Sequence, residues 1–235
     1  MWYYAVSGGF GRKPGEERKV PFVQLLDLSH FIAEDMPVYP GTEGPKLTPA
    51  NTYERDGFRE TLLCLYSHTG THMDAPAHLY PDGTTLDAFP VGQFVGSALV
   101  IDCRDVGLGA RIGMEAIAQQ QELADQAEFL LFCTGWDRYW GKPEYFGAYP
   151  CVDMTVVEYM LKSGKKGIGL DTIGLDPIAD PLLPLHRRLL SRGDRVILEN
   201  LCGLEKLPKG LVTRCALPLP YAQADGAPAR VIALW

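Results

Sequence analysis

Several common signatures are missing from this chain of 235 residues, and each absence excludes a class of protein. No apolar run approaches the length of about 20 residues that a membrane-spanning helix needs. The sequence contains no Gly-x-Gly-x-x-Gly and no phosphate-binding loop, so it does not predict a nucleotide-binding enzyme. The six cysteines are scattered and form no Cys-x-x-Cys pair, which argues against a thiolate zinc site and a disulfide framework.

Charge is not concentrated anywhere along the chain. The net charge of −7 comes from 22 basic and 29 acidic residues without an acidic block. This distribution favours a small-molecule substrate as partner and predicts neither a nucleic acid nor a membrane. Cysteines inside apolar runs are typical of a reducing compartment, and the start lacks the basic region of a secretory signal, so we expect a cytoplasmic protein.

The size and composition predict one catalytic domain. With 46% hydrophobic residues, the chain can bury one substantial core, and no interior linker or repeat divides it. We expect residues 1–20, which contain Gly8-Gly9 and Lys13-Pro14-Gly15, to form an N-terminal arm outside a domain of residues 21–235. The aromatic residues of this arm suggest a partner chain, and we expect a homo-oligomer, either a dimer or a tetramer.

Short apolar runs outnumber helical patterns, which predicts a mixed α/β fold. The expected strands are Phe22–Leu28, Glu60–Tyr66, Ala98–Cys103, Glu128–Phe132, Gly167–Leu170, Arg195–Leu198, Val212–Leu217 and Arg230–Leu234. The expected helices are Met114–Ala124, Leu182–Arg192 and a helix that Asp153 caps and Gly164 ends.

Three of the five histidines and a carboxylate lie within eleven residues. They are His68, His72, Asp74 and His78. All four positions are even-numbered, so an extended backbone would direct their side chains to one face. Thr69-Gly70-Thr71 and Pro76 disfavour a helix, and we expect a strand end that leads into a loop. Without a metal, each unsatisfied polar atom buried here would cost roughly 1–3 kcal/mol, so the pattern predicts a metal or catalytic site.

The same segment resembles the signature of the metal-dependent cyclase-like hydrolases, the family of bacterial kynurenine formamidase and isatin hydrolase. Residues 68–78 match every fixed position of its His-Thr-Gly-x-His-x-Asp-x-Pro-x-His pattern. Further matches follow in family order: Val38-Tyr39-Pro40-Gly41, Thr134-Gly135-Trp136, Gly169-Leu170-Asp171-Thr172, His186 and Ile197-Leu198-Glu199-Asn200-Leu201. The resemblance identifies the chain as a member of this family.

The resemblance implies the swivelling β/β/α fold, an α/β domain with a mixed sheet, a barrel-like centre and flanking helices. It also implies two divalent metals per subunit. Histidine and carboxylate ligands suit zinc, manganese and iron alike, and we expect zinc first, with manganese as the alternative. Asp74 would bridge the ions, His68 and His72 would bind one of them, and His186 and Glu199 the other. Independently, Glu199 interrupts an apolar run, where an unpaired carboxylate would be costly unless it faces water at a sheet edge.

His78 has two candidate roles. A divalent metal lowers the pKa of a bound water toward about 7, and the resulting hydroxide can attack an amide carbonyl. His78 would then act as general acid–base, taking a proton from water and returning it to the leaving amine. The competing assignment is a third histidine ligand, and the spacing alone does not decide between them. His30, after Leu28-Ser29, belongs to no such cluster of histidines and carboxylates, and we expect it to be structural.

These features predict a metal-dependent amidohydrolase that cleaves a small-molecule carbon–nitrogen bond other than a peptide bond. By resemblance, N-formylkynurenine, an intermediate of tryptophan catabolism, is the first candidate substrate. A lactam or cyclic imide such as isatin is the second. A non-catalytic metal- or ligand-binding relative is the alternative from another class, and an intact His78 argues against it.

Two residues bear on the choice of substrate. Tyr39 matches the aromatic position that lines the pocket in the family's formamidases, where it would stack on an anilide. As a surface turn residue, it would instead pack on Pro37 and Pro40. The family's formamidases have a serine where this chain has Gly174, so a hydroxyl near the site is missing.

Overall fold

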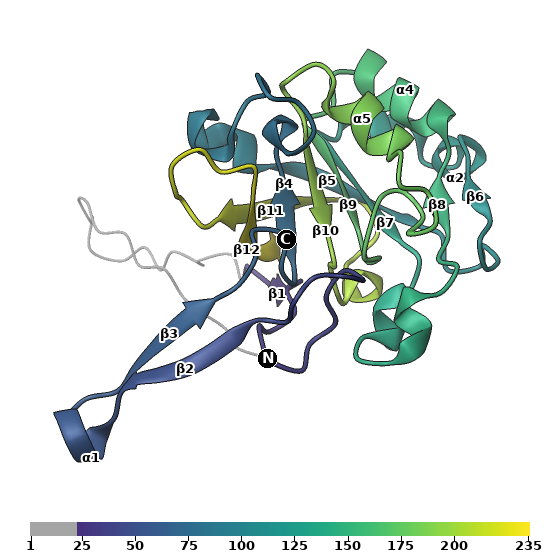
Figure 1. The fold of residues 1–235 in the computed structure, drawn as a ribbon. Helices are drawn as coiled ribbons and strands as arrows, with labels where there is room; N and C mark the ends of the chain where they lie inside the picture. Colours follow the sequence, from purple (N-terminus) through teal and green to yellow (C-terminus); the bar gives the residue numbers. More distant parts are fainter. Residues whose placement is uncertain (1–22) are drawn as a thin grey trace, which may run out of the picture.

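Seven strands close into a ring in the computed structural model, which describes residues 23–235 (Figure 1). Around the ring the order is β12, β11, β5, β7, β9, β10 and β4, and β4 pairs with β12 to close it. Strand β1 adds to β12 outside the ring. The bounds are β1 Leu25–Asp27, β4 His72–Asp74, β5 Val95–Asp102, β7 Phe129–Cys133, β9 Gly167–Leu170, β10 Val196–Glu199, β11 Leu211–Pro218 and β12 Gly226–Leu234. The predicted mixed sheet with a barrel-like centre is confirmed, whereas the N-terminal arm predicted for residues 1–20 lies outside the described residues.

Strand β7 has an apolar residue at every position and does not alternate between apolar and polar residues. Strands β5, β7, β9 and β10 run parallel, and every residue of β7 is buried. Leu130 and Phe132 pack into a core shared with the helices, while Phe129, Leu131 and Cys133 pack into a second core built from strands and loops. A strand that is covered on both faces needs an unbroken apolar run.

The helices on the outside of the sheet mostly follow their sequence signals. Helix α4, Met154–Lys162, begins where the Asp153 side chain accepts hydrogen bonds from the backbone N–H groups of Thr155 and Val156. The chain then reverses at Gly164, whose φ of 70° explains the glycine. Helix α5, Pro184–Leu190, is shorter than the predicted Leu182–Arg192, because Leu183 adopts a left-handed conformation and Pro184 starts the helix.

The helix predicted for Met114–Ala124 is wrong as a single element. The structure has two short helices, α2 Glu115–Ala118 and α3 Gln121–Gln126. Gln120 between them leaves the helical region, with φ −128° and ψ 27°. Ile117 and Ala124, one from each helix, are both buried in the core, so the break lets both short helices reach it.

A second, separate sheet is a hairpin that projects from the body (Figure 1). Its strands β2, Lys46–Asn51, and β3, Glu60–Cys64, are joined through the single helical turn α1, Tyr53–Asp56. Strands β6, Arg111–Ile112, and β8, Cys151–Val152, form a small parallel pair. The 3-10 turns are η1 Pro76–His78, η2 Leu86–Ala88, η3 Val91–Phe94, η4 Trp136–Tyr139, η5 Pro143–Phe146 and η6 Leu204–Lys206. Among residues 23–235, no helix has the length and apolar character to cross a membrane.

Candidate metal centre and active site

The signature histidines reach the site from three kinds of local structure. His72 and Asp74 lie on strand β4 and share one face, with the buried Met73 on the other. His68 lies in the turn before the strand, and Gly70 with φ 66° separates it from β4. His78 ends the turn η1. The predicted alignment along one extended backbone therefore holds only for His72 and Asp74, and a turn on each side brings in the other two.

Closure of the ring brings the second group of residues to β4. Strand β10 pairs antiparallel with β4, and this register places Glu199 opposite His72 and Ile197 opposite Asp74. Helix α5 supplies His186, which is buried next to Glu199. Segments more than a hundred residues apart in the chain thus meet at the strand that closes the barrel.

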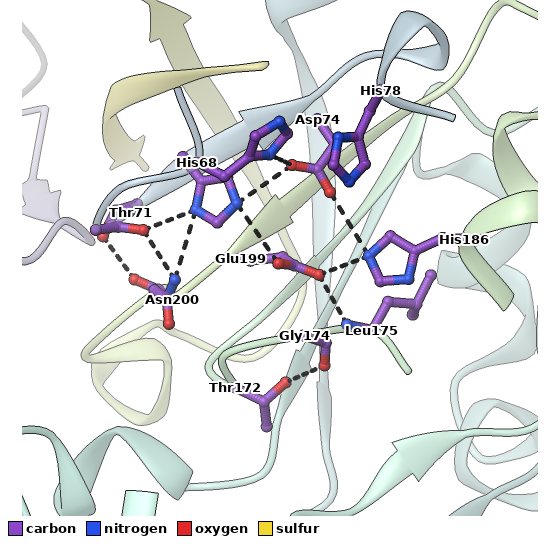
Figure 2. A network of polar contacts seen from close by, with 12 residues as sticks. His68, Thr71, Asp74, His78, Thr172, Gly174, Leu175, His186, Glu199 and Asn200 are labelled. Carbon is purple, nitrogen blue, oxygen red and sulfur yellow. Dashed lines mark hydrogen bonds and ion pairs between the residues drawn. The ribbon is translucent and has the colours of Figure 1, made fainter. Parts of the chain in front are cut away.

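Asp74 lies between two groups of ligand atoms (Figure 2). Its Oδ1 lies 2.7 Å from His68 Nδ1 and 3.2 Å from His72 Nε2. Its Oδ2 lies 3.6 Å from His186 Nε2, which in turn lies 3.0 Å from Glu199 Oε1. Two ligands bound at about 2.1 Å in a tetrahedral arrangement are about 3.4 Å apart, so the spacing suits metal coordination. Each carboxylate oxygen of Asp74 faces a different group, which is the geometry that a bridging ligand needs.

In each candidate imidazole ligand, the ring nitrogen that faces away from Asp74 also has a hydrogen-bond partner. His72 Nδ1 lies 2.8 Å from the Gly70 carbonyl oxygen, which fixes the tautomer that donates from Nδ1. His186 Nδ1 lies 2.7 Å from Asp176 Oδ2, and His68 Nε2 lies 2.9 Å from Asp225 Oδ2. All three rings are therefore held with their other nitrogen toward Asp74, as metal-binding histidines are.

The buried carboxylates of Asp74 and Glu199 give the centre negative charge that cations would neutralise. Burial alone would raise the pKa of Asp74, but the adjacent His68 and the hydrogen bonds from imidazoles hold it well below its usual range. Burial would lower the pKa of His186, yet its bonds to Asp176, Asp74 and Glu199 raise it well above the ordinary value. The carboxylates thus hold protons on the imidazoles, and divalent ions would replace those protons. The donor set and its charge both fit a divalent metal.

Glu199 is tied to the backbone as well as to the cluster. The N–H of Leu175 donates to Glu199 Oε1 at 2.7 Å, which holds the carboxylate in place. Glu199 is buried, so the sheet-edge alternative considered from the sequence does not apply. Its second oxygen, Oε2, lies 3.5 Å from His72 Nε2 and so links the two groups.

His78 lies beside the centre and outside both groups that share Asp74. Its ring packs on the ring of His68 with centroids 4.0 Å apart, and its Nδ1 lies 3.9 Å from Asp225 Oδ2. Burial lowers the pKa of His78, which favours the neutral imidazole that a general base needs. This position is compatible with proton transfer next to the cluster, while its role stays a prediction.

A cavity of about 420 Å³ opens above the cluster. Its walls combine the cluster with apolar groups, and no lysine or arginine lines it among the described residues. Tyr39, the predicted substrate contact, is part of this lining. Gly174 also lines it, and a Cβ there would lie 3.0 Å from both the Tyr149 hydroxyl and the Asp176 carbonyl oxygen, so a serine would be crowded.

Asp176 and Asp225 are functional candidates that sequence reasoning missed. Asp176 accepts hydrogen bonds from the backbone N–H groups of Leu185 and His186, and Asp225 contacts His68 from the loop before β12. Asp176 lies two residues after Gly174, but no spacing pattern singles it out. Asp225 follows no motif quoted above, and no sequence signal singles it out. In the structure, Gly226 beside it leaves room for the His68 ring, because a Cβ there would lie 2.4 Å from that ring.

The motifs Thr134-Gly135-Trp136 and Gly169-Leu170-Asp171-Thr172, both matched by resemblance, are hydrogen-bonded to each other and lie outside the metal centre. The Asp171 carboxylate accepts hydrogen bonds from the backbone N–H groups of Thr134 and Gly135 and from the Thr134 hydroxyl. Burial raises the pKa of Asp171 to about 6. His30 stacks on Trp140 with ring centroids 3.7 Å apart and belongs to none of the groups of possible metal ligands among the described residues, so its structural role stays a prediction.

The fold and this cluster define a class of protein: an α/β enzyme whose closed sheet carries a two-part histidine and carboxylate centre in a cavity, as metal-dependent hydrolases do. The chain belongs to the Cyclase family, whose model matches residues 26–177. A kynurenine formamidase from Geobacillus thermodenitrificans is 31% identical over 206 residues, which cover 87% of this chain and 94% of that protein.

Two solved structures extend the similarity to the whole architecture. An isatin hydrolase bound to the product analogue thioisatinate superposes with a TM-score of 0.80 at 25% identity and covers 91% of this chain and 92% of that chain. A potential metal-dependent hydrolase with cyclase activity has a TM-score of 0.72 at 28% identity, covering 90% and 98%. The predictions of family, fold and a hydrolase as enzyme class are confirmed, and the relatives together with the cluster support a divalent metal.

Proposed function

We propose that this protein is a metal-dependent amidohydrolase that cleaves the carbon–nitrogen bond of a small aryl amide, with N-formylkynurenine as the first candidate substrate. The observation that carries the proposal is Asp74, whose two oxygens face two separate groups of ligands at the cavity. The similarity to kynurenine formamidases at about 31% identity supports the substrate class.

In this proposal Asp74 would be shared by two ions, one held with His68 and His72 and the other with His186 and Glu199. Mixed imidazole and carboxylate ligands favour zinc, with manganese as the alternative. Bound there, the ions would supply Lewis acidity that polarises an amide carbonyl and makes water a nucleophile near neutral pH. The outer partners, Asp176 and Asp225 among them, hold the imidazoles ready for such ions.

The side chains around the cluster divide the remaining work. His78 takes a proton from the attacking water and returns it to the leaving amine, a role that its place beside His68 supports. Tyr39 packs against the aromatic ring of the substrate on the cavity wall. The apolar groups of the cavity exclude bulk water and so strengthen the local electrostatics.

A lactam or cyclic imide such as isatin is the second candidate. The observation that favours it is the cavity lining, which has no lysine or arginine within residues 23–235 to pair with the carboxylate of an amino-acid substrate. A neutral ring would leave no charge unpaired there. The similarity in fold to an isatin hydrolase agrees with this reading.

We also propose a cytoplasmic location. All six cysteines are free. Cys103, Cys133 and Cys151 are buried, and Cys64 is exposed. An exposed thiol such as Cys64 and three unpaired buried ones fit a reducing compartment.

A turnover assay on purified protein tests the proposed function. The metal-free protein, prepared with a chelator, is reloaded with zinc or manganese and incubated with N-formylkynurenine, formanilide and isatin. We expect metal-dependent turnover of at least one of them by the parent and none by Asp74→Ala. Equal turnover with and without metal would contradict the proposal, and a preference for isatin would select the second candidate.

A further inference from the structure

His72 differs from the other candidate imidazole ligands in what holds its second ring nitrogen. Carboxylates accept from the rings of His68 and His186, whereas His72 Nδ1 donates to the backbone carbonyl oxygen of Gly70 at 2.8 Å. A neutral carbonyl is a weaker acceptor than a carboxylate. The direction of the His72 ring therefore depends on how firmly the Gly70 peptide itself is held.

The Gly70 peptide needs support from another part of the fold. Gly70 lies in the turn before β4 with a φ of 66°, and a Cβ there would lie 3.0 Å from the Met36 side chain. This position thus requires glycine, the residue that loses the most conformational freedom when it is ordered. A contact that fixes its carbonyl group would also fix the imidazole that donates to it.

Asn200 makes that contact from the residue that follows strand β10 (Figure 2). Its Nδ2 donates to the Gly70 carbonyl oxygen at 2.8 Å. A carbonyl oxygen has two lone pairs, so it can accept from His72 and from Asn200 at the same time. The two donor nitrogens lie 3.5 Å apart, as two groups that share one acceptor do.

Tyr145, in the turn η5, fixes the orientation of the Asn200 amide. The Tyr145 hydroxyl lies 2.7 Å from Asn200 Oδ1. Because the Gly70 carbonyl can only accept, the amide nitrogen must face it, and Oδ1 must then accept from the hydroxyl. Tyr145 and Asn200 are both buried, so these hydrogen bonds are shielded from competing water.

The backbone at Asn200 does not by itself require asparagine. Its φ of 56° is left-handed, a conformation that glycine adopts without cost. The Asn200 N–H donates to the Thr172 carbonyl oxygen at 2.9 Å, and its own carbonyl accepts from the Thr71 hydroxyl at 2.5 Å. Glycine could make both of these bonds. What asparagine adds is the amide that links Tyr145 to Gly70.

We propose that Asn200 and Tyr145 are positioning residues for His72 and that they set the affinity of one of the two metal sites. The inference rests on the metal centre proposed above and concerns the ion that His72 would bind together with His68 and Asp74. Neither residue coordinates that ion. They act through the Gly70 carbonyl, which keeps the His72 ring directed at Asp74.

The second group of ligands is held by other bonds. The Leu175 N–H donates to Glu199, and Asp176 binds the ring of His186. Loss of the Asn200 amide should therefore weaken one ion and spare the other. This selectivity separates a positioning role from a general loss of structure.

Competition with a chromophoric chelator for zinc tests the proposal on the full chain. Asn200→Gly keeps the left-handed backbone and removes the amide. We expect it to weaken one ion by about 10-fold, the lower end for an outer partner, because the amide acts through a carbonyl. Tyr145→Phe should weaken the same ion less. The double variant should bind no more weakly than Asn200→Gly, because the two residues act in series.

The visible spectrum of the cobalt-substituted protein gives a second readout, because it reports the arrangement of the ligands around the metal. We expect Asn200→Gly and Tyr145→Phe to change it. The matched control is Tyr159→Phe in helix α4, which removes a tyrosine hydroxyl that bonds Asp125 at 2.6 Å outside the centre. It should leave both affinities and the spectrum unchanged.

Several outcomes would overturn the proposal. Folded variants with unchanged affinities and a lowered melting temperature would show a purely structural role, and equal weakening of both ions would remove the selectivity. Additive losses in the double variant would separate Tyr145 from Asn200. A parent that binds no metal would refute the proposed function itself, whereas a loaded parent with unaffected variants would refute only this inference.

A measurement on the unmodified parent does not depend on the folding of any variant. In the metal-free protein, the side-chain amide protons of Asn200 should exchange slowly with solvent in NMR spectra, because the amide is buried and bonded to Gly70. Fast exchange would show that the amide does not hold the carbonyl, and would overturn the proposal as well.

Discussion

The two halves of the candidate metal centre are built in opposite ways. His68 and His72 come with Asp74 from seven consecutive positions, and the His68 side chain keeps 22% of its surface exposed. His186 and Glu199 come from helix α5 and strand β10, and their side chains are only 6% and 7% exposed. The first half is local in sequence and open to the cavity at His68, although its His72 side chain is only 4% exposed, whereas the second is assembled by the fold and enclosed.

This difference indicates different tasks for the two halves. Backbone N–H groups of Leu175, Leu185 and His186 fix the carboxylates of the second half, so its geometry is set before any ion arrives. The first half borders His78 and the half-buried Asp225. We therefore expect the enclosed half to hold its ion more tightly and the open half to face the substrate.

The largest effect should come from the residue that both halves share. Asp74→Ala should lose both ions and reduce turnover to background, because each carboxylate oxygen faces one group. His186→Ala should lose mainly the ion of the enclosed half. Elemental analysis of both purified variants measures this, and an Asp74→Ala protein as fully loaded as the parent would show that the bridging assignment is wrong.

The variant His78→Ala should distinguish proton transfer from metal binding at the open half of the centre. Because it lies outside both groups that share Asp74, His78→Ala should keep near-normal metal content. Loss of a general acid–base typically lowers kcat by about 10²–10⁴. Steady-state kinetics and elemental analysis on the same preparation provide the check. A parallel loss of metal and activity would instead make His78 a ligand.

Asp176 and Asp225, which bind the ring nitrogens of His186 and His68, allow a direct comparison of the two halves. Removal of such a partner typically costs about 10–100-fold in metal affinity. We expect Asp176→Asn to reach the upper end, because buried Asp176 holds both the ring and the backbone of His186, and Asp225→Asn the lower end. Competition with a chromophoric chelator measures both, with surface Asp102→Asn as control. Equal losses would contradict the division into an open and an enclosed half.

The smallest effect concerns the stability of the metal-free protein. Burial alone would lower the pKa of His68, but Asp74 and Asp225 raise it to about 10, above its unfolded value of about 6.5. The stabilisation is therefore fully present below about pH 6.5 and is lost as pH rises toward 10, by about 1.4 kcal/mol per pH unit.

Thermal unfolding between pH 6.5 and 8.5 measures this loss in metal-free protein. The metal-loaded protein should show the opposite trend in the contribution of the ions, because protons compete with metals for imidazoles. A metal-free protein whose midpoint rises across this range would contradict the charge assignment at His68.

The sequence predicted individual elements well where local physics dominates. Strand β9 has the predicted bounds, Gly167–Leu170, and the Asp153 cap of helix α4 is present, because a buried apolar run and an N-cap are short-range signals. The break at Gln120 was not predictable from periodicity, since both halves of the segment keep a helical pattern. Packing against the core decided it.

The sequence by itself determined the chemistry of the site. The spacing of His68, His72 and Asp74 gives the ligand types of the first half, because residues so close in the chain need only the turn at Gly70 to bring their side chains together. Glu199 within an apolar run also signalled a buried carboxylate that needs a partner.

Only the tertiary structure decided how these residues combine. The pairing of β4 with β10 and β12 places Glu199 opposite His72 and brings Asp225 to His68, which no local pattern encodes. The physical reason is that ring closure depends on backbone hydrogen bonds between distant strands, whose register is set by packing of the whole sheet. The same holds for the projecting hairpin of β2 and β3, because β3 resembles a core strand in sequence and lies uncovered in the fold.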